Sequence, residues 1–145
     1  MKTLNSKWFE CKVRYDKMLD DGTTKKVTEQ FVVDALDFSE AEARVTDEVS
    51  AFISGDFDIV AEKIAPYREV FIGDGDVYYQ CRVNIITLDE NTGKEKKFAI
   101  HHLVLANSFD DARRIVANEY DKSMVDYVIA KLSETPTVDL FVHEA

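Results

Sequence analysis

Three side chains in this sequence could take part in chemistry, namely His101, His102 and Cys81. Imidazole nitrogens and thiolate sulfurs are common zinc ligands in proteins. His101 and His102 are adjacent, however, and adjacent side chains of a β-strand point to opposite faces, so the pair cannot chelate one ion. His102 and Cys81 are predicted to share a face, which leaves a site that joins them to a carboxylate as the remaining candidate. Because a full set of ligands is missing, we expect no metal and no cofactor, and a structural role for both histidines.

The two cysteines, Cys11 and Cys81, do not form a CxxC motif and are too few for a disulfide framework. Each lies among alternating apolar residues, a pattern that favours a buried, unreactive thiol over a redox partner. Neither belongs to a local motif that would supply the base of a cysteine nucleophile. We therefore predict reduced cysteines in the core.

The acidic motifs of the chain are explained by turns and solvated surfaces. Asp74-Gly75-Asp76 resembles the start of a calcium-binding loop, but the later ligands of an EF-hand are missing, so we interpret the segment as a turn. The sequence contains no phosphate-binding loop, nucleophile elbow or zinc-protease helix. With no convergent polar cluster, we expect that the protein is not an enzyme. Four acidic residues on the expected helices are interpreted as solvent-exposed: Glu40, Glu42, Asp47 and Glu48.

The composition limits the class of protein. The 145 residues include 18 Lys and Arg against 28 Asp and Glu, a net charge of −10, and 46% are hydrophobic. Such a chain can form a hydrophobic core, whereas its charge makes nucleic acid an unlikely partner, since phosphates attract Lys and Arg. The polar segment Met1–Lys7 holds no apolar run typical of a signal peptide or a membrane span, so we expect a cytoplasmic protein that does not bind membranes.

An internal duplication organises the chain. Trp8–Arg14 aligns with Tyr78–Asn84 at an offset of 70 residues, and this alignment superimposes the two cysteines. The offset becomes 71 through the next turn and helix and returns to 70 near the end of each copy, where Pro66 meets Pro136. The first half holds 10 basic and 15 acidic residues and the second 8 and 13, so each carries −5. We predict two repeats, residues 1–72 and 73–145, that form one compact unit.

Each repeat contains the same order of expected elements. In the first, apolar residues alternate over 9–15 as in a half-buried strand, a turn follows at 20–23, and a second strand returns over 27–35. A helix begins near residue 37, and strands are expected at 57–64 and 69–72, separated by a proline. The corresponding segments of the second repeat are 79–85, 91–93, 98–106, 108 onward, 125–132 and 138–142.

This order predicts an α+β fold built as a tandem duplication of a β-hairpin–helix–strand unit (ββαβ, with a short further strand). The two units are expected to be related by a pseudo-twofold axis, with helices packed on antiparallel sheets around a shared core. Asp37 and Ser108 should cap the helices, each with an acid three residues later. Apolar side chains at helical spacing should face the sheets: Ala41, Val45, Val49 and Phe52 in one helix, and Ala112, Ile115, Val116 and Tyr120 in the other.

One difference between the repeats suggests different surroundings. The expected strand over 98–105 is apolar on both faces, because Ala99, Leu103 and Leu105 occupy its second face. The first repeat has Thr28, Val32 and Asp34 at the matching positions. Since strands covered on both faces are apolar throughout, we expect the second repeat to lie more centrally.

Several motifs carry a family resemblance: Lys25–Phe31, Val33–Ala35, Glu40–Arg44, Ile85–Glu90, Thr92–Lys97 and Val125–Tyr127. Through them the chain resembles, over nearly its full length, an uncharacterised bacterial family, a domain of unknown function common in Bacteroidetes. That family has no assigned catalytic or ligand residues, so the resemblance implies no activity. Each repeat is also similar in pattern to the LX ribosomal proteins, with a hairpin, a helix and a strand. Those proteins are basic and hold ribosomal RNA, whereas both halves here are acidic.

These observations predict a non-catalytic interaction or scaffold module that binds a protein partner or a second copy of itself. Two alternatives remain open. The first is a small-ligand-binding protein or an enzyme with a pocket at the seam between the repeats, lined by His102, Cys81 and carboxylates. The second is a nucleic-acid-related protein or an acidic mimic of nucleic acid.

Overall fold

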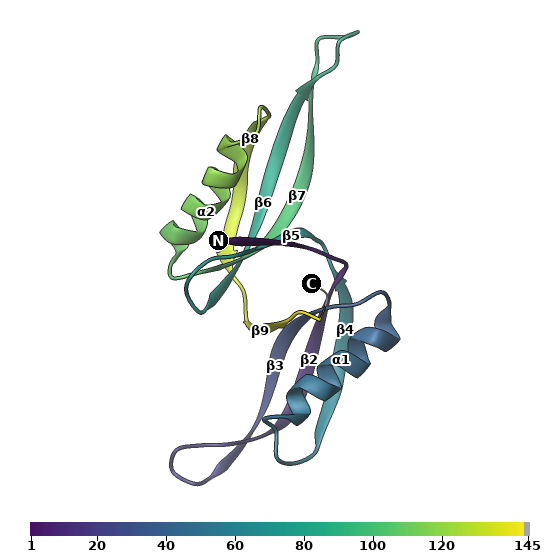
Figure 1. Ribbon diagram of the computed structural model, residues 1–145, viewed down its shortest axis with the longest axis vertical. Coiled ribbons are helices and arrows are strands. Elements are labelled where there is room, and N and C mark those ends of the chain that lie inside the picture. Colours follow the sequence, from purple (N-terminus) through teal and green to yellow (C-terminus); the bar gives the residue numbers. More distant parts are fainter. Residues whose placement is uncertain (144–145) are drawn as a thin grey trace. The chain divides into compact units, whose positions relative to one another are not determined.

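The computed structural model describes residues 1–143. It has two helices and two mixed sheets, and the strand-strand-helix-strand order occurs twice, which confirms the predicted α+β class and is consistent with a duplication. The elements are shown in Figure 1. In chain order they are β1 (Lys2–Asn5), β2 (Trp8–Met18), β3 (Thr24–Asp34), α1 (Phe38–Ser50), β4 (Phe57–Ala65), β5 (Tyr67–Ile72), β6 (Val77–Leu88), β7 (Glu95–Ala106), α2 (Phe109–Asp121), β8 (Asp126–Glu134) and β9 (Thr137–Phe141).

The chain divides into two compact units whose boundaries differ from those of the sequence repeats. Unit 1 consists of residues 1–5 and 66–135, and unit 2 of residues 6–65 and 136–145. The cause is an exchange of strands: β5 ends the first repeat but pairs in parallel with β7 of the second, while β9 ends the second repeat but pairs in parallel with β3 of the first. Two expectations about the sequence repeats stay predictions: the boundary between residues 72 and 73, and a core shared by the two repeats.

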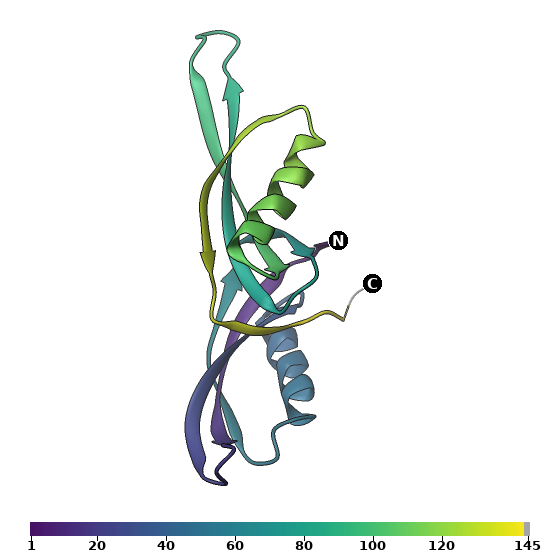
Figure 2. The same ribbon diagram turned by 90° about the vertical axis from the view of Figure 1, so that its left-hand side faces the viewer.

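Unit 1 is a five-stranded sheet in the order β1-β5-β7-β6-β8, with α2 packed against β7 and β8. Figure 2 shows α2 lying along one face of this sheet. Its core residues come from the inward-facing positions of the strands and from the apolar stripe of α2. The buried members of this cluster are Phe71, Tyr79, Cys81, Val83, Ile85, Val104, Ala106, Ala112, Ile115 and Val116.

Unit 2 repeats this arrangement in a four-stranded sheet, in the order β4-β2-β3-β9, with α1 packed against it. It has a core cluster of its own, so the buried apolar residues form two clusters, one within each unit. The buried members in unit 2 are Phe9, Cys11, Val13, Tyr15, Phe31, Val33, Ala35, Ala41, Val45, Val49, Ile53 and Phe141.

Both exchanged strands contain a β-bulge at equivalent places. In β5 the register shifts between Tyr67, which pairs with His101, and Glu69, which pairs with His102. The corresponding shift in β9 lies between Thr137 and Asp139. A bulge adds one residue to a strand and so redirects its side chains, which becomes important for the site described below.

The helix starts agree with the predicted capping pattern. The Asp37 carboxylate accepts a hydrogen bond from the Glu40 backbone N–H at 2.8 Å, and the Ser108 hydroxyl accepts one from the Asp111 N–H at 3.1 Å. The two acids reach back to the chain before each helix, accepting from the N–H of Leu36 and of Asn107. These contacts satisfy N–H groups that a first turn leaves free.

The end of α1 was predicted wrongly. The helix stops at Ser50, and Phe52, which the apolar spacing assigned to the buried stripe, is 56% exposed. Ile53 is buried in its place. Apolar spacing alone does not locate the last turn of a helix, and this segment holds no proline to mark it.

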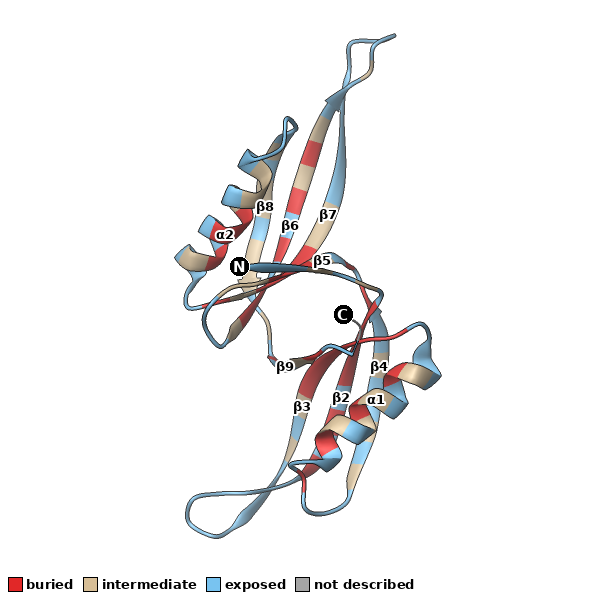
Figure 3. Ribbon diagram, viewed as in Figure 1, coloured by how far each residue is buried: buried red, intermediate tan, exposed pale blue. Residues whose placement is uncertain are grey.

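The expected contrast between the two strands is not found, because β3 is buried on both faces like β7. That the second repeat lies more centrally stays a prediction. Phe31, Val32, Val33 and Asp34 are all at most 1% exposed, as are residues 102–104. Figure 3 shows this continuous burial where β3 approaches α1. Asp34 has the sequence character of a surface residue, but its side chain is neutralised by partners from other elements, described below.

One strand was not predicted at all. The polar segment Lys2–Asn5 forms β1, which pairs antiparallel with β5. It has no apolar alternation, since only Leu4 is even partly buried, and its backbone pairing alone places it in the sheet. Within residues 1–143, neither helix is long and apolar enough to cross a membrane.

Candidate functional site

His102 and Cys81 lie directly opposite each other on β7 and β6, so their side chains share the face of the sheet that α2 covers, as predicted. His102 is completely buried, whereas His101 points to the other face and is half-buried. The His102 ring stacks on Phe71, with 4.6 Å between the ring centroids. The equivalent pair in unit 2 is Phe31 on Phe141, also stacked.

Both ring nitrogens of His102 are engaged in hydrogen bonds. Nδ1 lies 3.3 Å from the backbone oxygen of Glu69, and Nε2 lies 2.6 Å from the hydroxyl of Tyr120 on α2. A carbonyl can only accept, so Nδ1 carries the proton, and Nε2 accepts from the Tyr120 O–H. His102 thus ties β7 to β5 and α2. No group of three or more His, Cys, Asp or Glu side chains among residues 1–143 is placed to hold a metal ion.

Burial fixes the protonation of these groups. It lowers the pKa of His102 to about 4, an effect that the charges of Arg68 and His101 reinforce. Burial also raises the pKa of the Cys81 thiol to about 11 and that of Cys11 to about 12. Near neutral pH the imidazole is therefore uncharged and both thiols keep their protons. Thiols in this state are poor nucleophiles.

The buried imidazole leads to a prediction about acid stability. We expect the free energy of unfolding to fall as the pH is lowered from about 6.5 towards 4, by about 2–3 kcal/mol from this residue alone. In this range the unfolded chain protonates His102 near the usual pKa of 6.5, while the folded protein keeps it neutral. The unfolded state thus binds more protons and is favoured as the pH falls. Urea unfolding at a series of pH values measures the effect.

Two variants distinguish the contribution of His102 to this pH dependence from that of the carboxylates, which titrate in the same pH range. His102→Phe, which introduces the residue found at the equivalent position 31, should remove this part of the pH dependence. His101→Gln, which introduces the residue found at position 30, should retain it. If the wild type and His102→Phe lose stability in parallel between pH 6.5 and 4, His102 is not buried in its neutral form.

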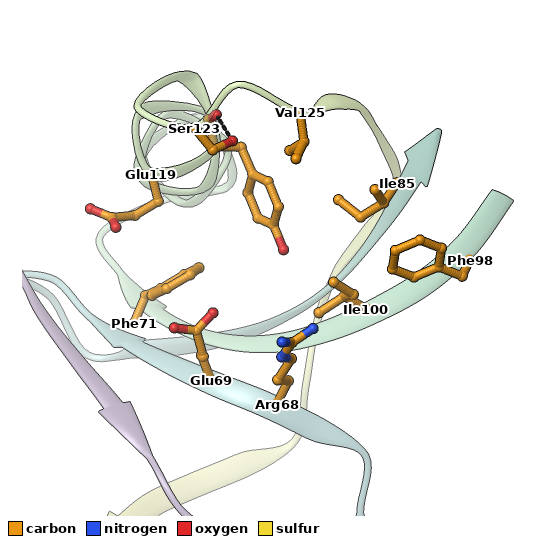
Figure 4. A pocket seen from close by; sticks show the side chains of 10 residues that line it. Arg68, Glu69, Phe71, Ile85, Phe98, Ile100, Glu119, Ser123 and Val125 are labelled. Atoms are coloured by element: carbon orange, nitrogen blue, oxygen red, sulfur yellow. Dashed lines mark hydrogen bonds between the residues drawn. The ribbon is translucent and has the colours of Figure 1, made fainter. Parts of the chain in front are cut away.

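Next to this histidine, unit 1 contains a cavity of about 400 Å³. Figure 4 shows its walls: the end of α2 with Glu119 and Ser123 on one side, and the curved strands β6 and β7 with Ile85, Phe98 and Ile100 on another. Strand β5 supplies Arg68, Glu69 and Phe71, and the remaining lining residues are Tyr120 and Val125. Because β5 comes from the first sequence repeat and the other elements from the second, both repeats contribute to this cavity, which we call the unit 1 pocket.

The β5 bulge places two opposite charges at the unit 1 pocket. In a regular strand Arg68 and Glu69 would point to opposite faces, but Figure 4 shows both side chains directed toward the cavity. Sequence reasoning missed both residues, because neither the bulge nor the pairing of β5 with β7 leaves a mark in the pattern of apolar residues.

The corresponding depression in unit 2 has a similar volume, about 380 Å³, but a different lining. Phe52 stands at the position equivalent to Ser123 and approaches Phe31, with 6.1 Å between ring centroids. Glu29 accepts a hydrogen bond from the Tyr15 hydroxyl and pairs with Lys17 at 3.4 Å. The two units thus differ in the side chains that line equivalent depressions, and the lining in unit 1 is the more apolar.

A second polar cluster, also missed from the sequence, lies in unit 2. Asp34, at the end of β3, has a completely buried side chain. Both its carboxylate oxygens lie 3.0 Å from the backbone N–H of His143, and Arg44 of α1 approaches within 3.4 Å. The His143 ring lies 3.2 Å from Asp34 and 3.0 Å from Glu48. This cluster joins the end of β9 to β3 and α1. In unit 1 the equivalent positions are Leu105, Ile115 and Gly73, which are not charged.

Comparison with known proteins gives one match. The family described as "Domain of unknown function (DUF4494)" matches residues 7–143, nearly the whole chain. No curated protein and no solved structure matches the chain. The match indicates no specific activity, so the geometry of the units is the basis for any functional argument.

Proposed function

Since the chain belongs to this DUF4494 family of unknown function, we propose a function from the site itself: the protein is a non-catalytic binding module that holds a small molecule in the unit 1 pocket. The observation that carries the proposal is the contrast between the two units. The equivalent depressions have similar volumes, about 400 Å³ in unit 1 and about 380 Å³ in unit 2, but their linings differ. Tyr15, Lys17 and Glu29 supply polar groups in unit 2, whereas unit 1 has a mostly apolar lining with Arg68 and Glu69. The volume of the unit 1 pocket lies within the range of small-ligand sites, which are mostly apolar with a few polar groups.

The chemistry of the neighbouring residues supports binding rather than catalysis. His102 uses both nitrogens within the fold, and burial raises the pKa of the Cys81 thiol to about 11, so neither is prepared to transfer a proton or attack a substrate. An RNA-binding role, implied by the similarity to LX ribosomal proteins, is disfavoured by the net charge of −10.

Titration with indole, a neutral aromatic probe, tests the proposal. We expect indole to shift the backbone amide resonances of Ile85, Ile100 and Val125 in the ¹⁵N-labelled protein. Ser123→Phe should abolish these shifts, because Ser123 lines the cavity and the substitution adds a bulky ring there. Arg82→Phe adds a ring at an exposed position on the opposite face of β6 from Ile85 and should leave binding intact.

Two results would contradict the proposal. One is that indole leaves the lining resonances unchanged at millimolar concentrations. The other is that it binds the wild type and Ser123→Phe equally well, which would place its site elsewhere.

A second candidate function is self-association through β8. This nine-residue strand is the last in its sheet, so its outer backbone edge has no strand partner among the described residues. Val128 on this strand is 50% exposed. An unpaired edge with exposed apolar side chains is a template for pairing with another strand, and a second copy of the chain offers the same edge. Two β8 strands would then pair antiparallel about a twofold axis.

Light scattering coupled to size exclusion tests this candidate. We expect a dimer at micromolar concentrations and a monomer for Val128→Lys, because a charge on an edge strand opposes pairing. Leu88→Lys changes an exposed apolar residue at the end of β6 and should leave the dimer unchanged. A wild-type protein that stays monomeric throughout this range would exclude self-association.

A further inference from the structure

The unit 1 pocket contains two charged side chains, Arg68 and Glu69, that have no bonding partner among the described residues. The other polar groups of its wall are occupied: the Tyr120 hydroxyl is bonded to His102, the Ser123 hydroxyl donates to the Tyr120 carbonyl, and Glu119 pairs with Lys122 at 3.0 Å. Within residues 1–143, the side chains of Arg68 and Glu69 form no ion pair or hydrogen bond, with each other or with any other group.

The charges of Arg68 and Glu69 both affect the pKa of Tyr120, which lines the cavity. The Glu69 carboxylate raises the pKa of the Tyr120 hydroxyl and the Arg68 guanidinium lowers it, although burial is the main cause of the high value, about 12. The two charges are therefore close enough to affect the same half-buried group. In unit 2 the equivalent bulge residues are Val138 and Asp139, and Asp139 bonds to the Leu140 backbone N–H. The opposite pair of charges is thus particular to unit 1.

The rest of the cavity is apolar. Aromatic and branched side chains from three strands and from the segment after α2 form its walls, namely Phe71, Ile85, Phe98, Ile100 and Val125. Figure 4 shows Phe98 and Ile100 on the side away from Glu119, so the charged and apolar parts of the cavity adjoin. A complementary ligand has an apolar body and, at one end, a positive and a negative charge close together.

We propose that the ligand of the unit 1 pocket is an α-amino acid with a large apolar side chain, held at its carboxylate by Arg68 and at its ammonium group by Glu69. The inference rests on the function proposed above and specifies its ligand class. Both charges of an α-amino acid are borne on one carbon atom, which matches two adjacent residues of opposite charge on one strand. Arginine presents a planar donor group suited to a carboxylate, and a carboxylate accepts from an ammonium group.

Calorimetric titration with three related probes tests the assignment. L-phenylalanine carries both charges, 3-phenylpropanoate only the carboxylate, and phenethylamine only the ammonium group. We expect L-phenylalanine to bind about tenfold more tightly than either of the others, because each lost charge-assisted contact costs about that factor. If either single-charge probe binds as tightly as L-phenylalanine, the assignment is overturned.

Charge variants identify the two contacts separately. Arg68→Gln should weaken the binding of L-phenylalanine and 3-phenylpropanoate by about tenfold and leave that of phenethylamine unchanged. Glu69→Gln should weaken the binding of L-phenylalanine and phenethylamine by about tenfold and leave that of 3-phenylpropanoate unchanged. Lys131→Gln, an exposed change on β8, should alter none of the three affinities. Equal effects of Arg68→Gln and Glu69→Gln on all three probes would overturn the assignment of one residue to each charge.

The indole titration separates this assignment from the proposed function. If indole binds and Ser123→Phe blocks it, while L-phenylalanine has no advantage over the single-charge probes, the ligand class is wrong and the pocket remains a binding site. If indole fails to bind at the lining residues, the proposed function falls and the assignment falls with it.

Discussion

Replacing Asp34 with alanine should lower the free energy of unfolding by about 3–5 kcal/mol, the range found when one partner of a buried ion pair is removed. The side chain is fully buried and is the acceptor for the His143 backbone N–H at 3.0 Å and the partner of Arg44 at 3.4 Å. Without it, the N–H that follows β9 loses its acceptor, and Arg44 retains Glu40, at 3.1 Å, as its carboxylate partner. Urea unfolding measures the loss.

Because the Asp34 cluster lies at the end of β9, Asp34→Ala should also loosen this strand in the folded protein. Because His143 follows β9 directly, amide hydrogen exchange in Thr137–Phe141 should accelerate more than exchange in β2. Asp34→Asn keeps an acceptor for the N–H but loses the charge, so it should cost less than alanine. Asp16→Ala, an exposed acid on β2, is the matched control and should change stability by less than 0.5 kcal/mol, roughly the limit for surface substitutions. A loss below about 1 kcal/mol for Asp34→Ala would show that the cluster does not hold β9.

Replacing Gly75 with alanine is expected to have an effect of comparable size. This glycine lies in the turn between β5 and β6 with φ +128°, a backbone conformation that other residues rarely adopt. A Cβ atom there would overlap the carbonyl group of Ala106 and lie 2.5 Å from the Asn107 nitrogen. Backbone strain of about 1–3 kcal/mol and steric overlap of about 1–3 kcal/mol should together lower the free energy of unfolding.

Gly55→Ala provides the control for this substitution. Its position has no positive φ, and an added Cβ would meet nothing within 4 Å. A loss of conformational freedom in the unfolded chain is then the main effect, and stability should be unchanged or slightly higher. If both variants unfold at the same urea concentration, the turn at Gly75 does not have the described conformation.

The sequence predicted the features that follow from local pattern. Alternation placed Cys81 and His102 on one face, and the capping pattern located the start of both helices, because these signals depend on residues close together in the chain. The alignment of His102 with Phe31 correctly assigned it to the core. The interpretation of Asp74-Gly75-Asp76 as a turn was also confirmed.

What escaped prediction depends on pairing between distant segments. Arg68 reaches the pocket through a bulge in a strand whose partner, β7, begins 27 residues later in the sequence, at Glu95. Asp34 follows the outward alternation of β3, and its burial is compensated by His143, which is 109 residues away. No pattern within one segment specifies such a partner. The short polar strand β1 was missed for the same reason, since its place in the sheet comes from backbone pairing with β5.

The exchange of β5 and β9 affects how this protein forms during synthesis. When a ribosome has released the first repeat, β3 still lacks its neighbour, because β9 follows all the other strands of the second repeat in the chain. Strands β1 and β5, although already synthesised, must wait for β7 before they can join a sheet with it. Neither unit can therefore be completed while translation continues through the second repeat, and the unpaired edge of β3 is exposed to other nascent chains until β9 has been synthesised.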